Sequence, residues 1–172
     1  MAVIHYTIET EAEKSPDFRR VLWTGTKTQL VVMTIPAGGE IGEEVHEDID
    51  QILTFVSGTG KAIVAGAEKN VASGDLVVVP AGKKHNFVNT GPNPLILYTV
   101  YGPPEHADGA VHKTKEEADE LEEAGEHRAA EVEREEALVG GVVAEEAGQH
   151  GQVRKQAGGP RRRAAKGGSI AK

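Results

Sequence analysis

Residues 74–89 read GDLVVVPAGKKHNFVN, and this stretch decides the fold. Its first two residues, Gly and Asp, favour a tight turn that leads into an apolar run. Pro80 ends that run, and Gly82 allows a turn conformation that other residues resist. His85 opens a second β-rich run, where its side chain can point to one face. The stretch therefore predicts two short strands joined by a tight turn, with a histidine at the start of the second.

Similar short runs fill the first hundred residues, each bounded by turn residues such as Gly, Pro and Asn. They are residues 3–9, 28–35, 51–57, 61–66, 75–80, 85–89 and 95–101. No helical pattern of about 10–15 residues separates them, which disfavours a parallel βαβ fold. Many short strands at regular spacing predict an antiparallel sandwich or barrel.

The stretch resembles the second motif of the cupin superfamily at every fixed position, which are Gly74, Pro80, Gly82, His85 and Asn89. The resemblance implies an all-β fold, the antiparallel double-stranded β-helix that is also called a cupin or jelly-roll barrel. It is closest to the small single-domain cupins, which are similar to mannose-6-phosphate isomerases.

The first cupin motif is Gly, five residues, His, one residue, His, three or four residues, Glu, six residues, Gly. The same spacing occurs here as Gly38, Glu44, His46, Gln51 and Gly58. Glu44 replaces the first His of the family pattern, and Gln51 replaces its Glu. The two motifs and the strands around them extend the resemblance over about residues 20–101.

The resemblance implies a divalent metal site inside the barrel, made by Glu44, His46, Gln51 and His85. Glu44 and His46 are two residues apart, so on a strand they face the same side. Two imidazoles and a carboxylate suit Fe(II), and the same donors accept Mn, Ni or Zn. Gln51 offers only a neutral carbonyl oxygen and is the weakest donor of the set. Glu44 is also the candidate catalytic residue, as a general base beside the metal if it is not a ligand.

Other acidic and histidine side chains leave alternatives open. Asp48 or Asp50 could supply the carboxylate instead, although an exposed acidic turn is the favoured interpretation. His106 and His112 follow the last predicted barrel strand, where we expect a covering loop without metal contact.

The composition changes after the barrel, and we divide the chain into three parts. Residues 1–112 form the predicted cupin barrel. Residues 113–139 are rich in Glu and Ala and predict an acidic, solvated helix. Residues 140–172 are Gly-rich and then basic, which predicts a disordered tail.

The sequence also restricts the function. The chain has a net charge of −8 and no cysteine. The absence of cysteine excludes disulfides and thiolate sites and is compatible with a cytoplasmic protein. The first residues lack a signal-peptide pattern, and no apolar run is long enough to cross a membrane. The basic cluster at 161–163 has no nearby aromatics, so nucleic-acid binding is not expected.

We therefore expect a small-molecule ligand or substrate, and a homodimer formed through barrel edge strands. The resemblance suggests a metal-dependent enzyme, for example a dioxygenase or a sugar isomerase. The alternative is a non-catalytic module that binds a sugar or another small ligand. A third possibility is an interaction protein that uses its acidic helix and basic tail.

Overall fold

The computed structural model describes residues 3–125 of the 172-residue chain. Its elements in chain order are α1 (Ile8–Lys14), β1 (Arg19–Thr24), β2 (Gln29–Ile35), β3 (Asp50–Ser57), β4 (Thr59–Val64), β5 (Ala67–Ala72), β6 (Leu76–Val79), β7 (His85–Asn89), β8 (Leu95–Gly102) and β9 (Val111–His112). A second helix begins at Lys115 and is described as far as Gly125. Neither helix has the length and hydropathy needed to cross a membrane.

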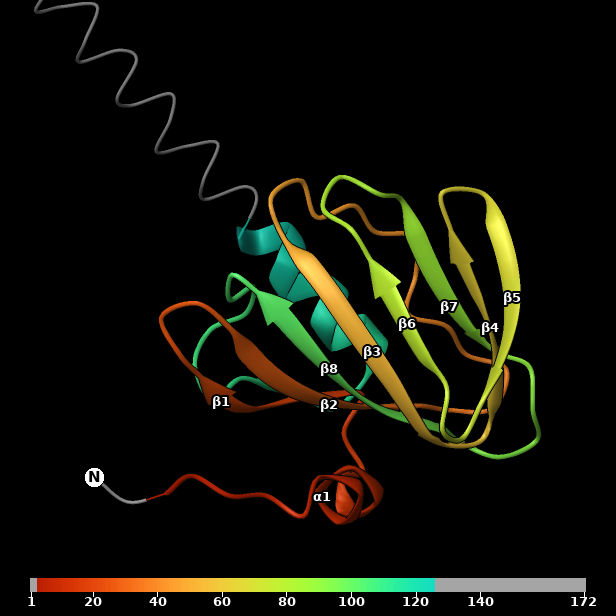
Figure 1. The fold of residues 1–172 in the computed structure, drawn as a ribbon, viewed down its shortest axis with the longest axis horizontal. Helices are drawn as coiled ribbons and strands as arrows, with labels where there is room; N and C mark the ends of the chain where they lie inside the picture. The colour runs from red at the N-terminus through yellow and green to blue at the C-terminus, as the bar shows by residue number, and fades with distance from the viewer. Residues whose placement is uncertain (1–2, 126–172) are drawn as a thin grey trace, which may run out of the picture. The chain divides into compact units, whose positions relative to one another are not determined.

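Two antiparallel sheets make the barrel (Figure 1). One has six strands in the order β6-β3-β8-β2-β1-β9, and the other has three in the order β5-β4-β7. The chain passes between the sheets repeatedly, so strands that are distant in sequence become neighbours. This arrangement confirms the predicted all-β double-stranded β-helix.

Alternation along the strands builds the core. In β8, every second residue from Leu95 to Tyr101 is buried, and in β7 His85, Phe87 and Asn89 are buried. The same alternation turns Gln51 on β3 toward the interior. Because side chains of a strand alternate between its two faces, polar residues of the two motifs enter a core that is otherwise apolar.

The N-terminal prediction was wrong. Residues 3–9 were expected to form a strand, but α1 begins at Ile8. Glu9 and Glu11 lie in the first turn of the helix and Lys14 in its last, which suits the helix dipole. Ala12 is fully buried, and the helix contacts β2, β3 and β8, so packing against the sheet decides its conformation.

Sequence patterns also missed three strands, namely β1, β5 and β9. β1 begins with two arginines, β5 is exposed at all but one position, and β9 has only two residues. Pairing with neighbouring strands stabilises these segments, and such pairing leaves no local apolar signal.

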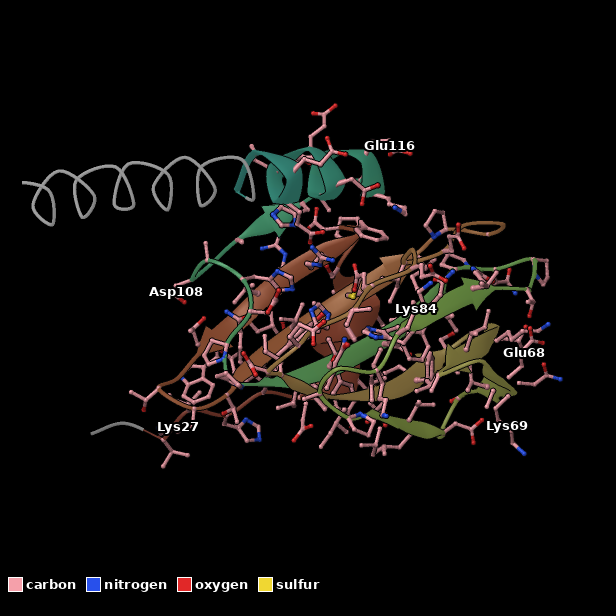
Figure 2. The ribbon with its side chains drawn as sticks, turned by 90° about the horizontal axis from the view of Figure 1, so that it is seen from above. Lys27, Glu68, Lys69, Lys84, Asp108 and Glu116 are labelled. Carbon is pink, nitrogen blue, oxygen red and sulfur yellow. The ribbon has the colours of Figure 1, made fainter. Side chains whose placement is uncertain are left out.

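The helix at 115–125 lies within the predicted acidic helix of residues 113–139. Figure 2 shows Glu116 on its outer side, while Ala118 is fully buried. The backbone amide of Phe18 donates to the carbonyl of Lys113, just before the helix begins. The rest of the predicted helix and the predicted basic tail lie outside the described residues.

Candidate metal centre

A pair of backbone hydrogen bonds brings the two motifs together. The amide of Glu44 donates to the carbonyl of His85 over 2.9 Å, and the amide of His85 donates to the carbonyl of Glu44 over 3.0 Å. The amide of Gly82 donates to the carbonyl of His46 over 2.8 Å. The turn of the second motif therefore holds the loop of the first motif in register.

This register gathers one carboxylate and two imidazoles. Ligand atoms of Glu44, His46 and His85 all lie within 4.8 Å of one another. The Oε2 of Glu44 is 3.4 Å from the Nε2 of His46 and 3.9 Å from the Nε2 of His85. The two imidazole centroids are 5.2 Å apart. Three of the four residues predicted from the sequence thus form a group that could hold a metal ion.

The far nitrogen of each imidazole is oriented by a neighbour. The Nδ1 of His85 lies 2.9 Å from the carbonyl oxygen of Lys83, so the Nδ1–H donates there. The Nδ1 of His46 lies 3.5 Å from Oε1 of Glu105. A metal-binding histidine commonly contacts a carbonyl or carboxylate through its other nitrogen in this way. Sequence reasoning missed Glu105, because the loop that carries it has no recognisable motif.

The donor atoms themselves have no hydrogen-bond partner. Nε2 of His46, Nε2 of His85 and Oε1 of Gln51 are buried and unpartnered among the described residues. The other end of the Gln51 amide donates to Oγ1 of Thr99 over 3.2 Å. Buried polar atoms in folded proteins are nearly always satisfied, so the two unpartnered imidazole nitrogens beside the Glu44 carboxylate fit a cation that binds when His46 loses its proton. The residues present therefore fit a divalent metal ion.

Comparisons with known proteins identify the family of this chain. Residues 31–101 match the family model of a cupin domain. The crystal structure of BH2720 from Bacillus halodurans has a TM-score of 0.67 and 37% sequence identity, and the match covers 68% of this chain and 93% of that one. This chain belongs to the cupin superfamily.

Two curated relatives are similar to this cupin. Protein YrkC of Bacillus subtilis is 38% identical over 117 residues, which are 64% of this chain and 63% of YrkC. Protein L612 of Acanthamoeba polyphaga mimivirus is 33% identical over 109 residues, 60% of this chain and 68% of L612. This cupin therefore spans less than two thirds of the length of YrkC.

The other acidic and histidine candidates of this cupin are not members of the Glu44, His46 and His85 group. Asp48 and Asp50 are exposed, and Oδ1 of Asp50 accepts a hydrogen bond from the amide of Ala81 over 2.9 Å. His106 packs against Tyr101 with ring centroids 5.0 Å apart, and His112 lies beside it at 6.4 Å. The group of possible metal ligands among the described residues is made by Glu44, His46 and His85 and does not include these two histidines.

Arg19 was also missed, although it is fully buried beside the group. Its Nη2 lies 3.5 Å from Oε1 of Glu44, and its Nη1 bonds Oε1 of Glu122 on the helix at 115–125. The sequence gives no signal for it, because two adjacent arginines at the start of a strand usually indicate an exposed edge.

The imidazoles differ in charge when no cation is present. Burial disfavours the charged form of His46, but the carboxylates of Glu105 and Glu44 outweigh it and raise its pKa to about 9. Burial lowers the pKa of His85, which keeps that ring neutral. A metal ion must therefore displace a proton from His46.

We expect metal affinity to rise between pH 6 and pH 8, by about tenfold per pH unit, because one proton is released per ion bound. Manganese titrations followed by electron paramagnetic resonance would measure the slope. An affinity that does not change over this range would contradict the assignment of His46 as a ligand.

Proposed function

We propose that this cupin binds a divalent metal ion through Glu44, His46, Gln51 and His85, and acts on a small molecule beside it. The observation that carries the proposal is the pair of unpartnered imidazole nitrogens, of His46 and His85, beside the Glu44 carboxylate. Glu44 contacts both imidazoles, which favours a ligand role over that of an independent base. Iron, manganese, nickel and zinc are the candidate ions for such donors.

A divalent ion held here would act as a Lewis acid on a carbonyl or enediol oxygen of the substrate. The protein's part is to hold the set rigid. Glu105 and the carbonyl of Lys83 fix the two rings, and Thr99 fixes the amide of Gln51. We propose dioxygenation or sugar isomerisation as the class of reaction at such a centre.

The test is metal analysis by mass spectrometry of untagged full-length protein, purified without chelators. We expect close to one ion of iron, manganese, nickel or zinc per chain, and the identity of the ion then directs substrate screening. No metal, even after reconstitution with each of the four ions, would overturn the proposal. That outcome would favour the alternative, a metal-free module that binds a sugar or another small ligand.

We also propose that this cupin forms a homodimer through the outer face of β6 and β3. Ile52, Leu76 and Val78 are exposed there by 41%, 57% and 53%. Ile52 pairs with Val78 across the two strands, so their side chains share one face. Strand β6 is the edge of its sheet, and an exposed apolar edge invites pairing.

The Leu76→Asp/Val78→Asp variant is expected to be a monomer at micromolar concentration, because dimerisation would bury two carboxylates in an apolar contact. Gel filtration with light scattering measures the mass. Leu121→Asp, which changes an equally exposed leucine on the helix at 115–125, is the matched control and should stay dimeric. A monomeric parent protein would overturn the dimer proposal.

A further inference from the structure

A row of polar side chains continues from the metal-binding group toward the helix at 115–125. The ring of His46 contacts Tyr101 with centroids 5.8 Å apart, Tyr101 contacts His106 at 5.0 Å, and His106 contacts His112 at 6.4 Å. Arg19 pairs with His112 in the register of β1 and β9. The row therefore extends the candidate centre with side chains that the metal set does not use.

Unpartnered atoms gather in this row as well. Nε of Arg19, Nε2 of His106 and Nδ1 of His112 are buried without a hydrogen-bond partner among residues 3–125. Arg19 is only 2% exposed, and leaving a donor of a buried guanidinium unsatisfied is costly. Burial and the charge of Arg19 lower the pKa of His106 to about 3, so its ring is neutral and offers one N–H donor.

Protein carboxylates contact two of the three nitrogens of the Arg19 guanidinium. Nη1 bonds Oε1 of Glu122, and Nη2 lies 3.5 Å from Oε1 of Glu44, but Nε bonds neither. A carboxylate binds arginine most strongly through two parallel hydrogen bonds. Glu122 makes one such bond from a side chain that is 43% exposed, so it can swing into solvent.

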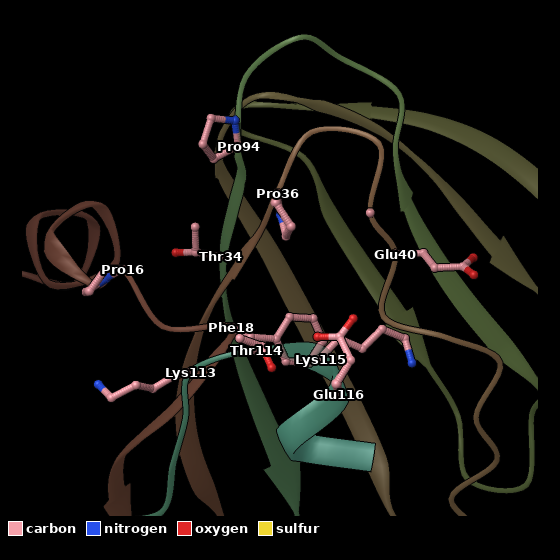
Figure 3. Close-up of a pocket in the computed structure, with 11 residues that line it drawn as sticks. Pro16, Phe18, Thr34, Pro36, Glu40, Pro94, Lys113, Thr114, Lys115 and Glu116 are labelled. Atoms are coloured by element: carbon pink, nitrogen blue, oxygen red, sulfur yellow. The ribbon is translucent and has the colours of Figure 1, made fainter. Parts of the chain in front are cut away.

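A cavity elsewhere in the barrel does not explain why the buried nitrogens of Arg19, His106 and His112 lack hydrogen-bond partners. The cavity drawn in Figure 3 has a volume of about 360 Å³, and its lining includes Phe18, Pro36 and Lys115. None of the unpartnered side chains of the row lines it. The helix at 115–125 reaches the row instead, through the contact of Glu122 with Arg19.

We propose that Arg19 is the anchor for a carboxylate group of the substrate, and that Glu122 occupies this anchor until the substrate replaces it. The substrate carboxylate takes the place of the Glu122 carboxylate on Nη1 of Arg19, with the N–H of His106 or His112 as a further donor. Because Arg19 also contacts Glu44, the anchored molecule lies next to the metal-binding group. The inference rests on the proposed function and narrows its substrates to carboxylic acids.

The test measures binding of malonate to full-length protein by calorimetry, with malonamide as the uncharged analogue of the same shape. We expect malonate to bind and malonamide not to bind. Glu122→Gln removes the competing carboxylate and should tighten malonate binding by about tenfold, as expected when a site that is mostly blocked becomes free. Glu120→Gln, an exposed position on the same helix, removes the same charge and should change the affinity less than about twofold, since solvent screens distant charges.

Arg19→Met keeps most of the side-chain volume and should abolish malonate binding, with circular dichroism as the check that it folds. If Arg19→Met does not fold, the malonate affinities of Glu122→Gln and Glu120→Gln are sufficient to test the proposal. Equal affinities of these two variants would overturn the proposal, as would failure of acetate, lactate and malonate all to bind the parent.

The titrations are made on both metal-free and zinc-loaded protein. If metal-free protein binds malonate, and Glu122→Gln tightens that binding, the result supports Arg19 as the anchor independently of the metal proposal. Binding seen only in the zinc-loaded protein and unchanged in Glu122→Gln would place malonate on the metal and overturn the anchor.

Discussion

The His46→Ala/His85→Ala variant is expected to lose its metal, falling from about one ion per chain to less than about a tenth. Two imidazoles supply most of the affinity of this set, because the amide oxygen of Gln51 is neutral and Glu44 alone is a weak, exchangeable ligand. Mass spectrometry of parent and variant, purified side by side, measures the difference.

His5→Ala is the matched control, because His5 is exposed and lies outside the metal-binding group. It should keep the metal content of the parent. Thermal unfolding of the metal-free proteins shows whether the double variant retains its fold, since His85 is buried. Full metal content in a folded double variant would refute the site assignment.

Gly58→Ala is expected to destabilise the barrel by about 2–5 kcal/mol, a large part of the total stability of a small domain. Gly58 connects β3 to β4 with a φ of +87°. A Cβ at this position would lie 2.4 Å from the carbonyl oxygen of Pro94 and 2.9 Å from the Cα of Leu95. Both are backbone atoms, so the chain itself must move, which adds about 1–3 kcal/mol to about 1–2 kcal/mol of backbone strain.

Gly74→Ala separates these two causes. Gly74 has a φ of +92°, similar to that of Gly58, but no heavy atom of residues 3–125, apart from Gly74 and its two chain neighbours, lies within 4 Å of where its Cβ would be. Only the backbone strain of about 1–2 kcal/mol should appear. Urea unfolding followed by circular dichroism compares the two variants, and equal losses would show that close packing on Pro94 does not matter.

Much of the barrel could be predicted from the sequence. The apolar runs that became β2, β3, β4, β6, β7 and β8 carry their own signal, because alternation and turn residues are local properties. Residues 3–9 and strands β1, β5 and β9 could not be predicted in this way. Contacts with the rest of the barrel determine the conformations of these segments. The local sequence pattern does not indicate such long-range contacts.

The resemblance of two sequence motifs to those of the cupin superfamily indicated the fold and implied Glu44, His46, Gln51 and His85 as candidate ligands. Two backbone hydrogen bonds between Glu44 and His85 explain why residues with this spacing come together in the structure. Only the tertiary structure decided which neighbours orient and complete the site. Glu105 reaches His46 from the loop after β8, and Arg19 reaches Glu44 from β1 while Glu122 closes over it from a helix. The physical reason is that such long-range contacts depend on how strands and helices pack, which no local pattern of residues specifies.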